Sequence, residues 1–315
     1  MVPNWNGAAR LEKLLASLSQ QTERASEVLV VDNASQDRSK QVADAAGAAW
    51  IPLDRNYGFA RAVNTGIRKS TGEATAILNN DVTLAPDFLA VLGGELDRHA
   101  FAVPKILMAD GTARIDGSFD LTSRGFCSWR AGHGFSESVT WNQQRNVASA
   151  PMTAALFRRS LFDEVGLLDE QFGSYLEDVD FGLRCALKGL FGSYKPAAVA
   201  WHEGSATLGG QWNTASVRWI ARNQVLLARK YGSLVTWPVL AGQMLWGLSA
   251  IKHGAGWAWF QGKIEGCRVE VPTIATEQLT QILRSQEQEI LTLLSGSGTS
   301  QSYWTAYFAL TGGHR

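Results

Sequence analysis

Three short polar clusters follow apolar stretches of the chain, and their side chains are suited to binding or catalysis. The clusters are Asp32-Asn33, Asn79-Asn80-Asp81 and, less directly, Trp201-His202. In open α/β sheets, ligands bind outside the carboxyl ends of the strands, so clusters that converge there form a candidate site. Asp32 could accept hydrogen bonds from a base or ribose, and Asp81 could bind a hard divalent cation, which prefers oxygen ligands. The alternative is that each cluster caps the helix that follows it.

A fourth cluster, Glu177-Asp178-Val179-Asp180, gathers three carboxylates at the expected start of a helix. Negative charges there complement the helix dipole, an effect worth about 0.3–1 kcal/mol per charge. The functional interpretation is that Asp178 is a general base, because carboxylates this close repel one another and shift each other's pKa. The residues alone do not choose between these roles.

Alternating apolar runs and helical periods predict the elements that would hold these clusters. The runs 27–31 and 74–78 are typical of strands buried on both faces of a sheet, and 50–53 and 154–157 are further strands. Residues 105–150 have no sustained period and predict hairpins and mobile loops. The pattern predicts an α/β fold with a mostly parallel central sheet. Helices are expected at about 38–46, 59–69, 86–96, 159–165, 177–190 and 214–231.

The beginning of the chain departs from this pattern. A helix with Leu11, Leu14 and Leu15 at helical spacing is preceded only by Met1-Val2-Pro3 and a polar turn. No signal peptide is therefore expected. We interpret the natural first strand as truncated, and a very short edge strand is the alternative.

Composition and absent motifs exclude several classes of protein. Hydrophobic residues make up 45% of the 315 residues, so a disordered chain is excluded. The 29 basic residues balance 29 acidic ones, which argues against a nucleic-acid partner. The three cysteines are far apart in sequence and predict neither a zinc cluster nor a disulfide framework. The glycine-rich dinucleotide fingerprint, the Walker phosphate loop and the nucleophile elbow are also missing.

Five ordered motifs resemble glycosyltransferase family 2, in its rhamnosyltransferase-like and galactofuranosyltransferase-like branch. The similarity runs from residue 1 to about 231. The motifs are Asn4-Trp5-Asn6-Gly7, Val30-Val31-Asp32-Asn33-Ala34-Ser35, the run from Asn56 through Gly58 and Asn64 to Gly66, Leu78-Asn79-Asn80-Asp81, and Tyr175-Leu176-Glu177-Asp178-Val179-Asp180 with Leu183-Arg184.

The resemblance implies a GT-A fold and inverting transfer from a nucleoside diphosphate sugar. It implies that Asp32 and Asn33 contact the base and ribose, that Asp178 is the catalytic base, and that a divalent cation, Mg²⁺ or Mn²⁺, is bound by Asp81 and His202. Further donor or acceptor contacts are implied for Pro3, Asn4, Asn6, Asn56, Gly58, Asn64, Asn79, Asn80, Glu177 and Arg222.

Two departures from the family pattern bear on this interpretation. Asn79 stands where the family has the first Asp of Asp-x-Asp, which lowers the charge of the cation site. The Gln-x-x-Arg-Trp signature of processive synthases is absent, so transfer of one sugar per encounter is expected.

The C-terminal part suggests membrane attachment. Residues 232–251 carry no charge, about the ~20 residues that span a bilayer, but Pro238, Gln243 and glycines interrupt them. Trp237, Trp246, Trp257 and Trp259 favour a membrane interface. We expect peripheral attachment rather than a transmembrane helix, with a helical cap as the alternative. We also expect an amphipathic helix at 275–294, a second helix in the tail, and a division into a catalytic domain, 1–231, and a helical extension, 232–315.

The leading hypothesis is a metal-dependent inverting glycosyltransferase that transfers one sugar to a hydroxyl of a glycan or lipid-linked acceptor in cell-envelope polysaccharide synthesis. We expect it in the cytoplasm at the inner face of the cell membrane. The alternative is a non-catalytic nucleotide-sugar-binding pseudoenzyme, disabled by the truncated strand and Asn79. The intact Asp178 favours the enzyme. A structural membrane-interaction protein would explain the tryptophans but not the five motifs.

Overall fold

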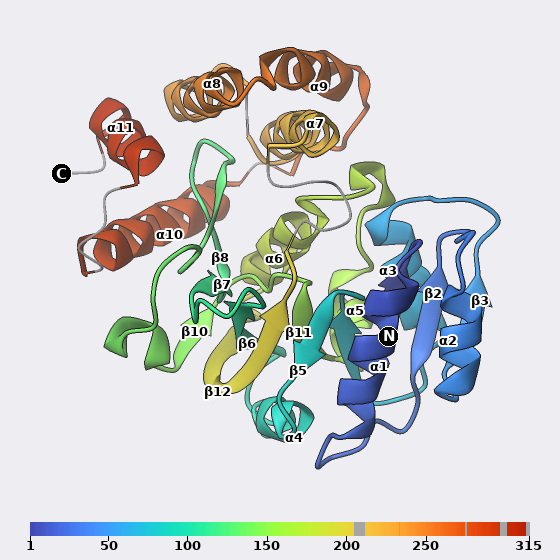
Figure 1. Ribbon diagram of the computed structural model, residues 1–315. Helices are drawn as coiled ribbons and strands as arrows, with labels where there is room; N and C mark the ends of the chain where they lie inside the picture. Colours follow the sequence, from blue (N-terminus) through green and yellow to red (C-terminus); the bar gives the residue numbers. More distant parts are fainter. Residues whose placement is uncertain (205–211, 233, 275, 297–300, 313–315) are drawn as a thin grey trace. The chain divides into compact units, whose positions relative to one another are not determined.

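The computed structural model describes residues 1–204, 212–232, 234–274, 276–296 and 301–312, and it confirms the predicted α/β class (Figure 1). The chain divides into two compact units. Unit 1 comprises Met1–Phe119 and Arg130–Thr207, and unit 2 comprises Asp120–Trp129 and Leu208–Arg315.

A short parallel sheet opens unit 1. Its strands β1 (Val2–Asn4), β2 (Leu29–Asp32) and β3 (Ala49–Pro52) pair in the order β1-β2-β3. Helices α1 (Ala8–Ser19) and α2 (Ser39–Ala45) connect them. The first strand is short but pairs in register, with Asn4 opposite Asp32, so the carboxyl ends of β1 and β2 lie together. The truncation upstream of β1 stays a prediction.

A second, larger sheet forms the centre of unit 1. Its main path runs β10-β12-β6-β11-β4, while β5 pairs with β12 and β7 with β6. The strands are β4 (Ala74–Leu78), β5 (Val82–Leu84), β6 (Phe101–Met108), β7 (Ile115–Gly117), β10 (Arg145–Val147), β11 (Ala154–Arg158) and β12 (Gly192–His202).

The larger sheet is mixed rather than mostly parallel. Strands β6 and β12 are parallel, but β11 inserts antiparallel between β4 and β6. As a result β4, β6 and β12 run in one direction and bring their carboxyl ends to the same edge. The amide of Leu78 donates to the carbonyl of Met1, which joins β4 to β1 and continues that edge into the first sheet.

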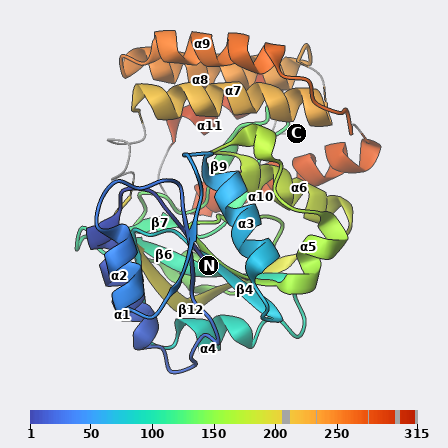
Figure 2. The same cartoon turned by 90° about the vertical axis from the view of Figure 1, so that its right-hand side faces the viewer.

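Helices cover the sheets of unit 1 because their apolar stripes are buried. In α1 these are Leu11, Leu14 and Leu15, which enter the main core with strand residues such as Val30 and Ile106. Figure 2 looks onto α3, with α1 and α2 to its left and α5 and α6 to its right. The other helices of unit 1 are α3 (Phe59–Lys69), α4 (Phe88–Gly93), α5 (Arg159–Val165), α6 (Glu177–Leu187) and the 3-10 turns η1 (Val139–Asn142) and η2 (Glu170–Phe172).

Unit 2 is helical apart from a hairpin of β8 (Asp120–Thr122) and β9 (Ser128–Arg130). Its helices are α7 (Thr214–Tyr231), α8 (Trp237–Lys252), α9 (Gly256–Arg268), α10 (Glu277–Gly296) and α11 (Ser302–Thr311). Helices α7 and α9 pack closely, because a Cβ at Gly262 would lie 2.2 Å from the carbonyl oxygen of Arg218. Helix α7, which ends at Tyr231, therefore belongs to unit 2. Within the described residues, no helix has the length and apolar character needed to cross a membrane.

Candidate active site

The carboxyl ends of β1 and β2 are joined by side-chain hydrogen bonds. The amide of Asn4 donates to Oδ1 of Asp32 at 2.9 Å and to the hydroxyl of Ser35 at 3.2 Å. Asp32 in turn accepts from the backbone amide and the hydroxyl of Ser35, at 2.8 and 2.5 Å. Asp32 is thus buried, with both oxygens engaged in holding the turn after β2. The turn is built before any ligand arrives.

The cluster after β4 joins the same network. The amide of Asn80 donates to Oδ1 of Asn4 at 2.7 Å, and the backbone amide of Asn79 donates to the carbonyl of Thr153 at 2.8 Å. A Cβ at Gly7 would lie 2.1 Å from the amide nitrogen of Asn80, so this close packing requires glycine. The structure therefore brings together the predicted residues after β1, β2 and β4.

Asp81 lies beside His202, as the sequence predicted. Oδ1 of Asp81 is 3.3 Å from Nε2 of His202. The other ring nitrogen, Nδ1, forms a 2.9 Å hydrogen bond with Oδ2 of Asp116. Burial would lower the pKa of His202, but the two carboxylates outweigh it and raise this pKa to about 9. In turn, although burial opposes it, the hydrogen bond from His202 holds the pKa of Asp116 below its usual value.

The Asp81–His202 pair fits a divalent cation. Oδ1 of Asp81 is buried and makes no hydrogen bond of good geometry within the described residues. A carboxylate oxygen of this kind, next to an imidazole nitrogen, is an acceptable donor set for Mn²⁺ or Mg²⁺. Asp116 would orient the imidazole through Nδ1, the usual arrangement for a metal-binding histidine. No group of three or more ligating side chains is found in the described residues, so phosphate or water oxygens would complete the coordination.

A small cleft opens next to Asp81. Its volume is about 180 Å³, and basic side chains from α1 face acidic ones across it. Lys13 forms a 2.6 Å ion pair with Glu203, which directly follows His202. The residues lining the cleft are Arg10, Lys13, Asp81, Val82, Thr83, Ala109 and Glu203.

Asn33, Asn56 and Gly58 form a second turn near the end of β2. The amide of Asn33 donates to the carbonyl of Gly58 at 3.3 Å, and the amide of Gly58 donates to Oδ1 of Asn56 at 2.9 Å. Gly58 has φ +87°, and a Cβ there would lie 2.9 Å from the carbonyl oxygen of Gly173. The motif glycine therefore allows the start of α3 to pack on the segment that precedes α6.

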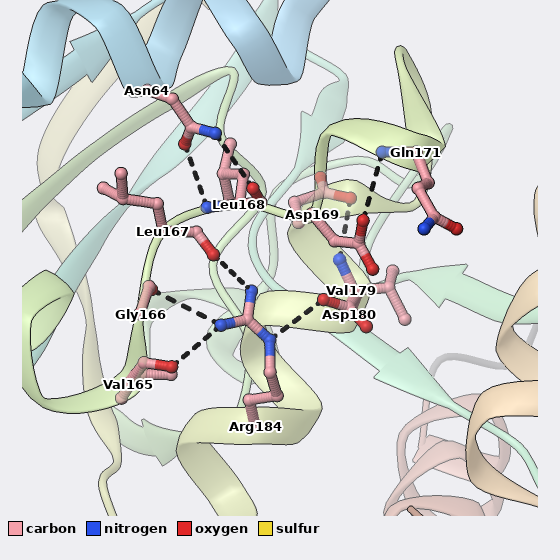
Figure 3. A network of polar contacts seen from close by, with 11 residues as sticks. Asn64, Val165, Gly166, Leu167, Leu168, Asp169, Gln171, Val179, Asp180 and Arg184 are labelled. Atoms are coloured by element: carbon pink, nitrogen blue, oxygen red, sulfur yellow. Dashed lines mark hydrogen bonds and ion pairs between the residues drawn. The ribbon is translucent and has the colours of Figure 1, made fainter. Parts of the chain in front are cut away.

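Asn64 holds a loop rather than presenting free atoms. Its carboxamide accepts from the amide of Leu168 and donates to the carbonyl of the same residue, both at 2.9 Å (Figure 3). A further bond runs to Glu170 at 3.0 Å. The predicted substrate contact at Asn64 is thus accompanied by a structural role, because all its described polar partners belong to the loop before α6.

Arg184 fixes the other side of that loop and one of the three clustered carboxylates. Its guanidinium donates to the carbonyls of Val165 and Leu167, at 3.0 and 2.8 Å (Figure 3). Nε of Arg184 donates to Oδ2 of Asp180, also at 3.0 Å, one helical turn earlier. Asp180 is fully buried in this ion pair. The pair explains Asp180 as a structural carboxylate.

Glu177 and Asp178 are the other two carboxylates of this cluster. Glu177 is buried, and its Oε2 has no hydrogen-bond partner within the described part of the chain. Burial raises the pKa of Glu177 well above its usual value, and the charge of Asp178 raises it further. Asp178 is half-buried and caps its own turn, because its Oδ1 accepts from the amide of Val179 at 2.9 Å.

Arg130 acts electrostatically on both groups of acidic side chains, and no local sequence pattern selects it. Its positive charge lowers the pKa of Asp116 and opposes the rise in that of Glu177. A nitrogen of its guanidinium also lies 3.5 Å from the hydroxyl of Thr153, the residue that holds Asn79. Arg130 therefore links the cation pair and the acidic cluster electrostatically.

The remaining predicted residues have diverse environments. Pro3 is buried in β1 opposite Val31. Asn6, at φ +46°, donates its backbone amide to the hydroxyl of Ser35, 2.7 Å away. Arg222 belongs to α7 of unit 2, where it donates to Oδ1 of Asn223 at 2.6 Å. Their contacts with a substrate stay predictions.

Asp116 is the other important residue that the sequence did not reveal. It falls in β7, within the stretch 105–150 that lacks a regular period, so no local signal selected it. Pairing of β7 with β6, and of β6 with β12, carries it to His202. Only the sheet register could have identified it.

Comparison with known proteins agrees with this site. The family model described as glycosyl transferase family 2 matches residues 1–166, more than half of the chain. The chain therefore belongs to this family and is a glycosyltransferase.

One similar sequence and two similar solved structures are informative. An N-acetylglucosaminyl-diphospho-decaprenol L-rhamnosyltransferase of Mycobacterium tuberculosis is 29% identical over 227 residues, covering 63% of this chain and 73% of that protein. Among solved structures, GalNAc-T7 with UDP, GalNAc and Mn²⁺ has a TM-score of 0.62 at 14% identity, covering 94% of this chain and 57% of that one. A mannosyltransferase of Pyrobaculum calidifontis in complex with GDP-Man and Mn²⁺ has a TM-score of 0.53 at 18% identity, covering 98% and 84%. These structures confirm the GT-A fold.

Proposed function

We propose that the protein transfers one sugar from a nucleoside diphosphate sugar, with inversion, to a hydroxyl group of a glycan or lipid-linked acceptor. The observation that carries this proposal is the convergence of the hydrogen-bonded Asn4–Asp32–Asn80 network with the Asp81–His202 pair at one sheet edge. Ligands of α/β proteins bind at such an edge. The family and fold of the chain support the reaction class.

The nucleoside end of the donor is assigned to the turns after β1 and β2. Asp32 and Asn33 sit in a turn that Asn4 and Ser35 already hold, so binding costs little local ordering. A base and ribose offer donors that such carboxylate and carboxamide oxygens accept. Asn6, Asn56 and Gly58 line the adjoining turns and are the next candidates for contact.

The diphosphate is assigned to Asp81 and His202. A divalent cation held by these residues would act as a Lewis acid on the leaving diphosphate, whose negative charge grows as the sugar bond breaks. The chain's own contribution is orientation, because Asp116 holds the imidazole of His202 toward Asp81. Two of the similar solved structures are complexes with Mn²⁺, which supports this assignment.

Asp178 is assigned as the general base. The acceptor hydroxyl attacks the anomeric carbon on the face opposite the diphosphate and gives its proton to the Asp178 carboxylate. Of its neighbours, Asp180 is tied to Arg184, and the raised pKa of Glu177 favours the neutral acid. A neutral Glu177 can donate a hydrogen bond to the acceptor, while the ionised Asp178 takes the proton.

The acceptor and the location are inferred from a similar protein and from the nature of the donor. The rhamnosyltransferase similar to this chain is named for a decaprenol-linked acceptor, which supports a polyprenyl-diphosphate-linked glycan of the cell envelope as the acceptor here. A nucleotide-sugar donor is a cytoplasmic metabolite, so we place the reaction at the inner face of the cell membrane.

A two-part experiment tests the proposed function. First, UDP-, GDP- and dTDP-sugars are screened for thermal stabilisation of the full chain, with and without Mn²⁺. One class should raise the melting temperature, and more so with Mn²⁺. Second, that donor is offered with short-chain polyprenyl-diphosphate N-acetylglucosamine, and the anomeric configuration of the product is read by NMR. Stabilisation without transfer to any hydroxyl acceptor would favour the pseudoenzyme, and a retained configuration would refute inversion.

A further inference from the structure

Helix α8 exposes an unbroken apolar stripe. Trp237, Leu240, Met244, Leu248 and Ile251 follow one another three or four positions apart, so they share one face of the helix. All five are exposed, and Met244 and Leu248 are 62% and 61% accessible. Large apolar side chains scattered singly over a surface are ordinary, but a continuous stripe of this kind marks an interaction site.

Helix α9 repeats the pattern. Trp257, Phe260 and Ile264 are exposed at the same helical spacing, and Trp257 is 70% accessible. The ring of Phe260 lies 5.6 Å from that of Trp257, between centroids. Figure 2 shows α8 and α9 running alongside each other. The exposed residues of both helices are called the apolar face below.

The opposite sides of both helices are occupied by packing, so the apolar face is directed outward. On α8 the buried positions are Val239, Ala241, Gly242, Gln243, Gly247 and Ala250. A Cβ at Gly247 would lie 2.6 Å from the ring of Trp259 on α9. The glycines bring the helices together, while the bulky side chains of the apolar face stay exposed; Trp237 donates its indole N–H to the carbonyl of Leu310 at 2.8 Å.

Positive charge predominates around the apolar face. Between residues 214 and 268, which span α7, α8 and α9, there are seven lysines and arginines and one acidic residue. Lys230 is buried, and the amine of Lys263 is hydrogen-bonded between the helices to Gln224 and Gln243, so the other five cations supply the charge at the surface. The acidic residue, Glu265, is in an ion pair with Arg218. The whole chain is neutral, so this excess of positive charge is local. Lys252 and Arg268 are exposed at the ends of α8 and α9.

We propose that the apolar face binds the surface of an anionic lipid bilayer, with α8 and α9 lying parallel to the membrane plane. Apolar side chains would enter the boundary between headgroups and acyl chains, while the surrounding cations meet lipid phosphates. Exposed Trp237 and Trp257 are suited to the interfacial depth. The proposal is independent of the sugar-transfer chemistry.

Helix length and surface charge favour an anionic bilayer surface over two alternatives, a membrane-spanning helix and a second copy of the chain. Helix α8 has 16 residues, hence a length of about 24 Å, which is shorter than the roughly 30 Å hydrocarbon core. It can therefore lie on a bilayer but not cross one. A second copy of the chain would bring two faces of like charge together, which is unfavourable. An anionic bilayer complements the same charge.

Flotation of the full chain with lipid vesicles tests the proposal. The wild type should float with vesicles of phosphatidylcholine containing about 30 mol % phosphatidylglycerol, and much less with phosphatidylcholine alone. The double variant Leu248→Glu/Trp257→Glu should bind the anionic vesicles at least about tenfold more weakly. The matched control is Val139→Glu/Phe191→Glu, which changes two exposed apolar residues of unit 1 and should bind as the wild type does.

Two companion measurements separate the outcomes. The rate of sugar transfer to a water-soluble acceptor should be the same for the wild type and both double variants. A failure of vesicle binding is then distinct from a failure of the proposed function. Sedimentation of the lipid-free protein reports self-association. Absence of vesicle binding by the wild type would overturn the proposal, as would a dimer that only the Leu248→Glu/Trp257→Glu variant disrupts.

Discussion

Each unit contains a buried ionisable side chain that its surroundings favour as neutral, but the two side chains differ in hydrogen bonding. In unit 2, burial lowers the pKa of Lys263 to about 7, and its amine donates to the side-chain oxygens of Gln224 and Gln243, both at 2.8 Å. In unit 1, burial raises the pKa of Glu177, yet its Oε2 has no described partner.

The difference separates structural from functional burial. A buried polar group with its hydrogen bonds made contributes to a specific fold, as Lys263 does between α7, α8 and α9. A buried group left without a partner carries a cost of about 1–3 kcal/mol, which is retained where a ligand supplies the missing partner. Oε2 of Glu177 is of this second kind. The predictions below test this distinction.

The largest effect is expected at Asp178. Asp178→Asn keeps the shape of the side chain but removes the proton acceptor, so kcat should fall by about 10²-fold or more while donor affinity hardly changes. Turnover and donor binding, measured on the same preparation, check this. Normal transfer by a folded Asp178→Asn protein would remove Asp178 from the mechanism.

Asp180→Asn is the matched control in the same cluster. Because Asp180 is buried against Arg184, its loss should lower the free energy of unfolding by on the order of 2–3 kcal/mol. Turnover per folded molecule should stay within about threefold of the wild type, since no reacting group is removed. A loss of turnover equal to that of Asp178→Asn would contradict the different roles assigned to Asp178 and Asp180.

The second effect concerns the cation. Mn²⁺ should strengthen binding of the nucleoside diphosphate to the wild type by about 10- to 100-fold, and Asp81→Ala should abolish that gain. Asp116→Asn should reduce it partially, because His202 would lose its orienting hydrogen bond. Titration calorimetry with and without Mn²⁺ measures both variants. An unchanged gain in Asp81→Ala would refute the assignment.

Much of this site follows from local sequence, because the turn residues lie directly after buried strands. The apolar run 74–78 is strand β4, and the period over 59–69 is helix α3. Asn79 and Asn80 directly follow β4, and Asn33 directly follows β2, so all three lie at the sheet edge. What local pattern cannot supply is pairing between distant strands. The antiparallel insertion of β11 depends on such pairing, as does the approach of Asp116 to His202.

The third prediction concerns Lys263 and the stability of the protein. The pKa is about 7 in the folded state and near 10.5 when unfolded, so the unfolded chain binds more protons in this window. The free energy of unfolding should therefore rise between pH 7 and about pH 10, by about 3–4 kcal/mol from this group. Lys263→Met should flatten the rise, whereas Lys252→Met, at an exposed lysine, should leave it intact. Denaturant unfolding at several pH values measures the slopes, and equal slopes in all three proteins would contradict the assignment.

The smallest effect, and the one of opposite sign, is expected at Glu177. Its pKa is raised on folding, so its contribution to stability is complete below the ordinary value of 4.5 and is lost as pH rises toward the raised value. Glutamine resembles the neutral acid and cannot ionise, so Glu177→Gln should match the wild type near pH 4.5 and become more stable than the wild type toward pH 8. Turnover should fall by less than about tenfold, because the carboxamide can still donate a hydrogen bond to the acceptor. Melting temperature and transfer rate across this pH range measure both quantities. A variant that is less stable at pH 8 than at pH 4.5, relative to the wild type, would mean that Glu177 is ionised and bonded in the fold, and the contrast with Lys263 would not hold.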